Sequence, residues 1–394
     1  MIPTPFHART EPICYSWAWE EWAGYIAAQM YELEHTHEYH AIRTATAMFD
    51  FTPLQKYHVR GPDAEKLLDR VLTRNVKKCQ VGQIVYTVWC DDEGKILNDG
   101  TLSRLGKDSY RLAANDPSLA WIRDNAYGMD AQIEDVTEEI AVLSLQGPTS
   151  RDVVNAVIAE DISDLPFFRS TEATIDGSPV TVGRAGFTGD LGYEIWLNPD
   201  DAERIWDIFI DRGRSYAIKP SGTHALDVAR IEACLLVADI DYIPANKTMF
   251  EVQKSSPLEL GFNWLVHLKK PYFVGQQALR EEKARGPAEI LVGLDIDLVG
   301  LETIYAEFGM PMHLPHEAWS DHTPIYSEGK QIGKATSGTW SPLLKKYIAL
   351  ARVKPEFAAP GSVVDLEETV EATHRRVKAT VVKTPFFDPE RKRA

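Results

Sequence analysis

The chain has 394 residues, of which 44% are hydrophobic and 25% are charged. This composition is typical of a globular protein with enough apolar material for two or three domain cores. The net charge of −16 disfavours nucleic acid as a partner, since phosphates would be repelled unless basic residues formed a concentrated stripe. No apolar run approaches the roughly 20 residues of a membrane-spanning helix, and the first residues lack a secretory pattern. We therefore expect a cytoplasmic protein without a membrane segment.

The cysteines and histidines do not predict a metal site. The four cysteines are far apart and form no CxxC pair: Cys14, Cys79, Cys90 and Cys234. This spacing disfavours a zinc site, a redox dithiol and a disulfide scaffold. His35, His37 and His40 cluster, but no adjacent cysteine or carboxylate pair completes a ligand set, so we expect solvated or capping roles for them.

Hydrophobic periodicity predicts alternating strands and helices in the first half of the chain. Period-two alternation predicts strands at 56–60, 84–90, 109–114, 141–145 and 180–187. Amphipathic spacing predicts helices at 62–72, 200–212 and 221–236. Further upstream, Trp19, Trp22, Ile26 and Met30 also follow helical spacing, which is typical of a helix face packed in a core.

The chain changes character after about residue 285. Strand-like pieces follow one another at 290–296, 324–326, 331–335, 348–353, 362–366 and 377–383. Glu328, Gly329 and Lys330 indicate a hairpin turn within this set. We predict a separate all-β C-terminal domain. The stretch 298–322 contains two prolines and three histidines, and we expect a long loop there that is either functional or mobile.

A glycine-rich segment runs from Gly186 to Trp196. It has three glycines in seven positions, and Glu194 stands at the start of the strand that follows. Glycines let a backbone turn and approach a ligand closely, and a strand is a rigid place to mount a carboxylate. An exposed hairpin turn with a surface glutamate explains the same residues. The segment alone leaves both interpretations open.

This segment resembles the GYTGEDGFE signature of the glycine-cleavage T-protein (aminomethyltransferase) family of folate enzymes. Four further stretches match that family in order. Residues 94–99 resemble its GGIxDD turn, and 145–148 resemble its LQGP. Residues 230–233 stand where the family has RLEA, and 336–338 with 341–346 resemble its TSG-SP-LKK. Five motifs in register over about 250 residues identify the chain as similar to this family.

The resemblance implies an α+β fold, a three-domain cloverleaf with a C-terminal all-β, barrel-like domain. By position, 1–50 and 140–240 would form the first α+β domain, and 51–139 with 241–285 the second. Residues 286–394 would form the C-terminal β domain. Tetrahydrofolate would bind in the central hole between the domains.

The resemblance also implies the site residues. Glu194 would accept hydrogen bonds from the amino-pyrimidine edge of the pterin. Asp99 corresponds to the family's catalytic aspartate, and Tyr86 and Asn115 to residues that line the folate pocket. Phe187 lies within the signature itself. Without the resemblance, Asp99 is an ordinary turn residue ahead of a glycine, and Tyr86 is a strand residue of a core.

Several positions depart from the true T-protein. Phe187 replaces the tyrosine of the signature, Leu226 replaces an arginine, and Asn98 replaces the first aspartate of the DD pair. Residues 49–54 differ from FDVSHM, and 298–322 has no T-protein counterpart. These changes weaken an assignment to lipoyl-protein chemistry more than an assignment to folate.

We therefore expect an enzyme that moves a methyl group from a small S-, N- or O-methylated substrate to N5 of tetrahydrofolate. The alternative is aminomethyl transfer from a lipoyl carrier protein. A non-enzymatic folate-binding module is disfavoured, since the reactive cysteine of such relatives is missing. The chain has no GxGxxG fingerprint, so a flavin dehydrogenase would have to be a separate partner. Aromatic residues that would hold a cationic donor are Trp22, Tyr25 and Trp340.

Overall fold

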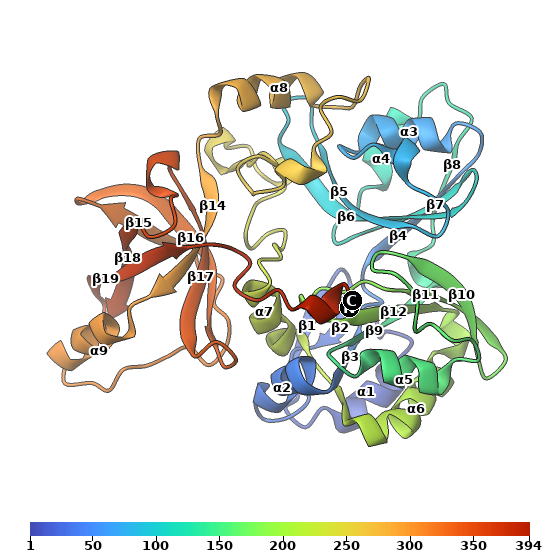
Figure 1. Cartoon of the computed structure of the whole chain (residues 1–394), viewed down its shortest axis with the longest axis horizontal. Helices are drawn as coiled ribbons and strands as arrows, with labels where there is room; N and C mark the ends of the chain where they lie inside the picture. Colours follow the sequence, from blue (N-terminus) through green and yellow to red (C-terminus); the bar gives the residue numbers. More distant parts are fainter.

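The computed structural model describes residues 1–394, and Figure 1 shows three lobes around a common centre. Two lobes combine a β-sheet with helices, and the third is a closed barrel. This confirms the predicted α+β cloverleaf with its C-terminal β-barrel. The strands of each sheet fall within the ranges proposed for one domain. The domain boundaries themselves stay a prediction.

The first lobe contains a six-stranded sheet in the order β10-β11-β12-β9-β3-β13. Its strands are β3 (Thr46–Asp50), β9 (Ala141–Gln146), β10 (Ser170–Ile175), β11 (Ser178–Gly183), β12 (Gly192–Leu197) and β13 (Ile218–Pro220). Met48 and Leu143 face a core shared with α5 (Ser150–Val157) and α6 (Ala202–Gly213). Phe49 and Val142, one residue away on each strand, face a second core shared with α2 (Thr36–Thr44) and α7 (Thr223–Glu232). Both faces of the sheet are buried, which explains why every residue of β9 is apolar or inaccessible.

The second lobe is built on a five-stranded antiparallel sheet in the order β5-β6-β7-β4-β8. Its strands are β4 (Gln55–Arg60), β5 (Ile84–Cys90), β6 (Ile96–Gly106), β7 (Ser109–Ala114) and β8 (Gln132–Asp135). The apolar faces of α3 (Ala64–Val71) and α4 (Leu119–Asn125) pack on one side of it, with Leu67, Leu102 and Leu112 fully buried. The predicted strands 84–90 and 109–114 are confirmed at both ends. A further helix, α8 (Gln276–Arg285), belongs to the same lobe (Figure 1).

The third lobe is a closed six-stranded barrel in the order β14-β17-β16-β15-β18-β19. Its strands are β14 (Ile290–Ile296), β15 (Thr323–Ser327), β16 (Lys330–Ser341), β17 (Lys346–Val353), β18 (Val363–Val370) and β19 (Thr373–Val382). Pairing of β14 with β19 closes the barrel and removes its free edges. The hairpin turn predicted at Glu328 and Gly329 joins β15 to β16.

Two sequence-based expectations for secondary structure were wrong. The aromatic stretch near the N-terminus is a β-hairpin, β1 (Trp19–Trp22) with β2 (Tyr25–Ala28), and not a helix. Trp19, Trp22 and Ile26, which were expected on one face of a helix, lie instead on the two strands of this hairpin. The stretch 298–322 is not entirely loop, because it begins with α9 (Leu298–Glu307).

Smaller differences concern element ends. The helix expected at 221–236 is shorter, because α7 begins after Gly222 and ends at Glu232. The strand expected at 180–187 ends at Gly183. The first lobe also carries a single-turn helix near the N-terminus, α1 (His7–Thr10). None of the helices is both long enough and apolar enough to span a membrane.

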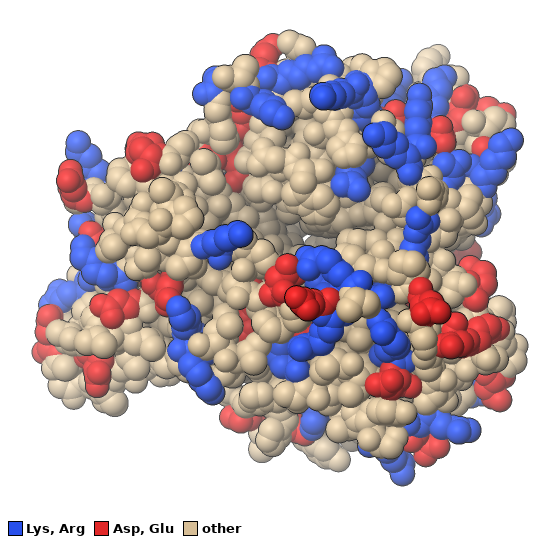
Figure 2. Space-filling view, viewed as in Figure 1, with Lys and Arg blue, Asp and Glu red and all other residues tan.

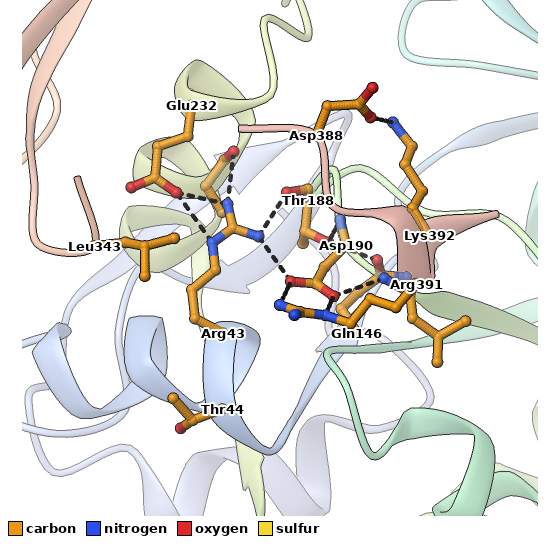
Figure 3. A network of polar contacts seen from close by, with 12 residues as sticks. Arg43, Thr44, Gln146, Thr188, Asp190, Glu232, Leu343, Asp388, Arg391 and Lys392 are labelled. Carbon is orange, nitrogen blue, oxygen red and sulfur yellow. Dashed lines mark hydrogen bonds and ion pairs between the residues drawn. The ribbon is translucent and has the colours of Figure 1, made fainter. Parts of the chain in front are cut away.

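A buried ionic network joins the first lobe to the barrel and to the C-terminal segment (Figure 3). Arg43 of α2 donates to Glu232 at the end of α7 through Nη2, at 2.7 Å, and through Nε, at 3.0 Å. Its Nη1 lies 3.4 Å from Asp190 and donates to the Thr188 carbonyl at 3.0 Å. Arg391 holds the other side of the Asp190 carboxylate, with two hydrogen bonds of 2.7 and 2.8 Å.

Replacing this central arginine tests how much the network stabilises the fold. We expect Arg43→Met to lower the free energy of unfolding by about 3–5 kcal/mol, because Glu232 would stay buried without its cation, whereas Asp190 would keep Arg391. Arg9→Met is the matched control, since Arg9 pairs with two acidic residues at the surface and should change stability by less than about 1 kcal/mol. Urea unfolding followed by circular dichroism measures both, and equal effects would contradict the assignment.

Candidate functional site

The three lobes meet around an opening that is visible in the space-filling view (Figure 2). In the same view of the ribbon, β5 and β6 of the second lobe and α7 of the first approach this centre (Figure 1). Of the site residues predicted from the sequence, Tyr86 lies on β5, Asp99 on β6 and Glu194 on β12.

Asp99 lies on β6, opposite Val88 of β5, and carries a half-buried carboxylate. The Tyr86 hydroxyl donates a hydrogen bond to its Oδ2 at 2.6 Å. The Tyr242 hydroxyl donates a short hydrogen bond to its Oδ1. Burial raises the pKa of Asp99, while the two hydroxyls act in the opposite direction because they stabilise the charged form. Asp99 is therefore a carboxylate that is held in place by two phenols, with no cation paired to it.

Tyr242 was not found from the sequence. It lies 143 residues after Asp99, in the segment that follows α7, and no motif marks it. Its neighbour Asp241 accepts a hydrogen bond of 2.5 Å from Nη1 of Arg230, within the motif that resembles RLEA. Asp241 also accepts hydrogen bonds of 2.7 Å from the hydroxyls of Thr336 and Ser337. Arg230, Thr336 and Ser337 thus hold Asp241 in place, and with it the adjacent Tyr242, which contacts Asp99.

Asn98 has a structural role beside Asp99. Its Nδ2 donates to the Asp116 carbonyl at 2.9 Å and to the Ser118 hydroxyl at 3.1 Å, and its Oδ1 accepts from the Asp99 amide at 2.9 Å. A neutral amide satisfies donors and acceptors together, which an aspartate at this position would not do. The departure from the family's DD pair therefore leaves the backbone at Asp99 well supported.

Glu194 lies on β12, paired with Gly183 of β11 and with Ser144 of β9. Burial raises the pKa of Glu194 to about 7, although Arg111 and the Trp196 side chain both favour its charged form. Arg111 comes from β7 of the other lobe, and its guanidinium lies 3.9 Å from the centroid of the Trp196 ring. It forms no direct ion pair with Glu194. The carboxylate accordingly keeps acceptor capacity for N–H donors of a ligand.

The glycines of the signature segment pack against protein and not against a ligand. A Cβ atom on Gly186 or on Gly192 would lie 2.1 to 2.3 Å from the amide of Gln146, the second residue of the stretch that resembles LQGP. Gly189 has a φ of +74°, and a Cβ there would lie 2.3 Å from Cβ of Ala233. The side chain of Gln146 donates to the Ser144 hydroxyl at 2.9 Å. The motifs thus occur together because they contact one another.

Asn115 connects the folate residues to the N-terminal hairpin. Its Oδ1 accepts a hydrogen bond of 2.9 Å from Nε1 of Trp22. Asn115 directly precedes Asp116, whose carbonyl is bound by Asn98. Trp22 packs edge-on against Phe51, with ring centroids 5.8 Å apart, and Phe187 packs against the same cluster. The structure therefore packs Trp22 and Phe187 against one cluster, beside Asn115 at the end of β7.

A small pocket lies behind Trp22. Its cavity volume is about 20 Å³, about the size of one water molecule. Five of its 14 lining residues are aromatic: Trp19, Trp22, Tyr31, Phe49 and Phe51. Asp50 also lines the pocket, and burial raises the pKa of its carboxyl against the hydrogen bonds of Thr4 and Thr52. The nearest interior lysine, Lys56, donates to the carbonyls of Thr52 and Thr137 instead. Asp50 is thus an acidic group among aromatic faces without an ion-pair partner.

Two predicted substrate residues lie elsewhere. Tyr25 is buried on β2 and does not line the pocket. Trp340 lies on β16 and packs against the core of the barrel, apart from Trp22. Of the three aromatic candidates, only Trp22 borders the pocket. Tyr31, Phe49 and Phe51 also border the pocket and were missed, and Trp19, which was expected on a helix, reaches it through the hairpin of β1 and β2.

No group of three or more His, Cys, Asp or Glu residues has the geometry of a metal site. Within the cluster noted from the sequence, His37 bonds Glu32 at 2.9 Å. His35 instead stacks on His316 of the 298–322 stretch, with ring centroids 4.9 Å apart, and burial lowers its pKa to about 4. This stretch therefore docks against the first lobe.

Comparisons with known proteins agree with this arrangement. The model of the GCVT N-terminal domain matches residues 12–270, and that of the glycine cleavage T-protein C-terminal barrel domain matches 308–388. An aminomethyltransferase of Halothermothrix orenii is 32% identical over 89% of this chain and 90% of its own length. A trimethylamine-oxide aldolase of Ruegeria pomeroyi is 35% identical over 90% of this chain, which spans only 43% of that relative.

A solved structure shows the same fold. The crystal structure of the glycine cleavage system aminomethyltransferase T from Bartonella henselae superposes with a TM-score of 0.82, covering 98% of both chains at 23% identity. The first family model alone spans more than half of the chain. The chain belongs to the glycine-cleavage T-protein family of folate-dependent one-carbon transferases.

Proposed function

We propose that this enzyme transfers a methyl group from a small methylated cation to N5 of tetrahydrofolate. The observation that carries the proposal is the group of aromatic side chains around Asp50, which adjoins the folate residues through the hydrogen bond between Trp22 and Asn115. A methylated onium group is attracted to aromatic faces by about 0.5–2 kcal/mol for each favourable contact. The unpaired Asp50 carboxylate adds the opposite charge.

The residues present fit tetrahydrofolate. Glu194 keeps free acceptor capacity for the N–H groups of the pterin, and Asp99 stands in the same opening with its carboxylate aligned by two tyrosines. Tetrahydrofolate, when bound, supplies the amine nitrogen that accepts the methyl group. The Asp99 carboxylate would take up the proton which that amine releases, and its raised pKa suits this role.

The names of the relatives support two donors. Trimethylamine oxide carries methyl groups on a positively charged nitrogen, as the proposed donor does, and the relative named for it matches over 90% of this chain. The alternative is aminomethyl transfer from a lipoyl carrier, which the several relatives named aminomethyltransferase favour. Against it stand the departures at Phe187 and Leu226, which place apolar groups where that enzyme has a hydroxyl and a cation. Under this proposal, any flavin dehydrogenase that acts with this enzyme would be a separate protein.

Folate affinity should depend on the charge of Glu194. Because the charged form accepts N–H donors and its pKa is about 7, we expect affinity for tetrahydrofolate to fall as the pH is lowered from about 8 to about 6. Glu194→Gln should weaken binding roughly 10- to 100-fold at pH 8 and remove this pH dependence. Titration calorimetry measures both effects. Glu203→Gln, on the surface of α6, is the control, and unchanged affinity in Glu194→Gln would overturn the pterin assignment.

Asp99 and its tyrosines should affect turnover more than binding. We expect Asp99→Asn to reduce kcat by about 10²- to 10⁴-fold while folate affinity changes little, as for a proton acceptor. Tyr242→Phe removes a hydrogen bond that lowers the pKa of Asp99, so the acid limb of the pH–rate profile should move to higher pH. Equal losses of kcat and folate affinity in Asp99→Asn would reassign the residue to positioning alone.

The folate product separates the two donors. With a methylated ammonium or sulfonium donor, we expect mass spectrometry to detect 5-methyltetrahydrofolate. Trp22→Leu should raise KM for the donor because it removes an aromatic face of the pocket, and Trp340→Leu should leave that KM unchanged. A 5,10-methylene product that forms only with an aminomethyl-loaded lipoyl carrier would favour the alternative.

A further inference from the structure

Five arginine side chains of this protein are buried, and one of them has no polar partner. Four donate hydrogen bonds to carboxylates, hydroxyls or backbone carbonyls: Arg43, Arg184, Arg230 and Arg352. Arg111 is only 5% exposed, yet it forms neither a hydrogen bond nor an ion pair, and its Nε is inaccessible and unsatisfied. Unused N–H donors of a cation are unfavourable in a protein interior. Arg111 therefore lacks an acceptor that a ligand can supply.

Arg111 lies on the same face of the second lobe's sheet as the predicted folate residues. Asp99 and Ser103 are four positions apart on β6, so their side chains point to one face. Ser103 pairs directly with Arg111 of β7, and Thr101, between them, pairs with Tyr86 of β5. The opposite face packs on α3 and α4. Arg111 thus lies in the row of side chains next to that of Tyr86.

This face lies against β11 and β12 of the first lobe (Figure 1). A Cβ atom on Gly183, which pairs with Glu194, would lie 3.0 Å from Cδ1 of Ile84. The Arg111 guanidinium lies 3.9 Å from the ring centroid of Trp196, two residues after Glu194 on β12. Contact with a ring face attracts the cation but gives its N–H donors no acceptor atom. Arg111 and Glu194 are therefore unpaired neighbours at the contact between the two lobes.

The charges around Arg111 decide which kind of acceptor fits it. Burial lowers the pKa of Arg111 to about 10 against the attraction of Glu194 and Glu172, so it is a cation at neutral pH. On its own sheet it pairs with His58 of β4, whose pKa is lowered to about 4 by burial, by Arg60 and by Arg111 itself. Two carboxylates already face this cation and would repel a third, but they would not repel a neutral carbonyl oxygen. An uncharged oxygen therefore fits best.

The pyrimidine edge of a reduced pterin offers such an oxygen. It presents the 2-amino group and N3–H, which are donors, and beside them the 4-oxo oxygen, which is an acceptor. We propose that Arg111 is a second pterin-binding residue, which donates to the 4-oxo oxygen of tetrahydrofolate while Glu194 accepts from the two adjacent donors. The inference rests on the proposed function, because that function places the pterin at Glu194. A cation and a carboxylate from different lobes thus recognise three successive groups of the ligand.

This arrangement makes the enzyme selective for 4-oxo pterins. In a 4-amino pteridine an amino group replaces the oxygen, and N3 carries no proton. Arg111 would then face a donor, and Glu194 would face an acceptor at N3. Because unsatisfied buried groups are costly, the 4-amino form loses affinity at both residues. The comparison of the two ligands therefore separates a contact to the pterin from a purely structural role of Arg111.

The test compares the Kd of tetrahydrofolate with that of 4-amino-4-deoxytetrahydrofolate by anaerobic calorimetry. We expect the wild-type protein to bind tetrahydrofolate more tightly by roughly 100-fold or more, because both residues discriminate. Arg111→Met should weaken tetrahydrofolate binding roughly 10- to 100-fold and change the Kd of the 4-amino analogue less than about threefold. Arg111→Lys keeps a cation with N–H donors and should restore part of the affinity for tetrahydrofolate. Since Arg111 has no polar partner in the ligand-free protein, neither substitution should markedly lower the temperature of thermal unfolding.

Arg104→Met is the matched control, because Arg104 also lies over an aromatic ring of this sheet, that of Tyr110, but on the opposite face. It should keep both Kd values. Equal losses for the two ligands in Arg111→Met, or an unchanged Kd of tetrahydrofolate, would overturn the inference while the proposed function stands. A higher KM for the methyl donor without a change in folate affinity would assign Arg111 to the donor and also refute the inference. Failure of the wild type to bind tetrahydrofolate would overturn both.

Discussion

The buried guanidinium of Arg43 is the interaction on which the arrangement of this enzyme depends. Its donors are shared between Glu232 of α7, Asp190 of the signature segment and the carbonyls of Thr188 and Ala229 (Figure 3). Burying three charges costs desolvation energy that their attraction only partly offsets, so stability alone does not explain the network. The geometry of the network explains it, since the planar guanidinium of Arg43 fixes a helix, a loop and the end of a second helix relative to one another.

The carboxylates of Glu232 and Asp190 also connect Arg43 to other parts of the chain. Glu232 accepts hydrogen bonds from Tyr39 and from Ser341 of the barrel, and Asp190 accepts two from Arg391 of the C-terminal segment. The signature segment, which ends in Glu194, is therefore held by the barrel and by residues 200 positions away. We infer that these contacts set the position of Glu194 before any ligand binds, which is what a binding site needs from its surroundings.

Much of the secondary structure could be predicted from the sequence because it follows from local patterns of apolar and polar residues. Apolar residues at every second position predicted β5 and β7 to the residue, and amphipathic spacing predicted α3 and α6 within two residues. The same reasoning failed for the N-terminal hairpin, because Trp19, Trp22 and Ile26 are spaced as on one helix face although they lie on two paired strands. The start of α9 was overlooked although Asp297 is a good N-cap residue. Its side chain accepts a hydrogen bond from the Val299 amide at 3.1 Å.

The candidate site was predictable only in part, for a different reason. The resemblance named Asp99, Tyr86 and Glu194. The segment alone had suggested that its glycines let the backbone turn or approach a ligand, whereas Gly186 and Gly192 make room for Gln146. Tyr242 was missed because it reaches the site through a contact across more than a hundred residues of sequence. Such contacts depend on the packing of whole lobes, and no local pattern records them.

The carboxylates of the interior fall into two groups. Asp190, Glu232 and Asp241 are each bound by an arginine, and they hold segments together. Asp50, Asp99 and Glu194 also lie in buried surroundings, yet none has an ion-pair partner, and burial raises the pKa of all three. Leaving a carboxylate unpaired in a protein interior is unfavourable, and such groups persist where a ligand completes them.

Each of these three carboxylates lacks a different partner. Asp50, which faces an aromatic pocket, lacks a cation. Asp99, which is aligned by two phenols, lacks a proton, and Glu194, which retains free acceptor positions, lacks a set of N–H donors. Under the proposed function, these three missing partners would be a charged methyl donor, an amine that loses a proton on methylation and the pterin that carries the amine.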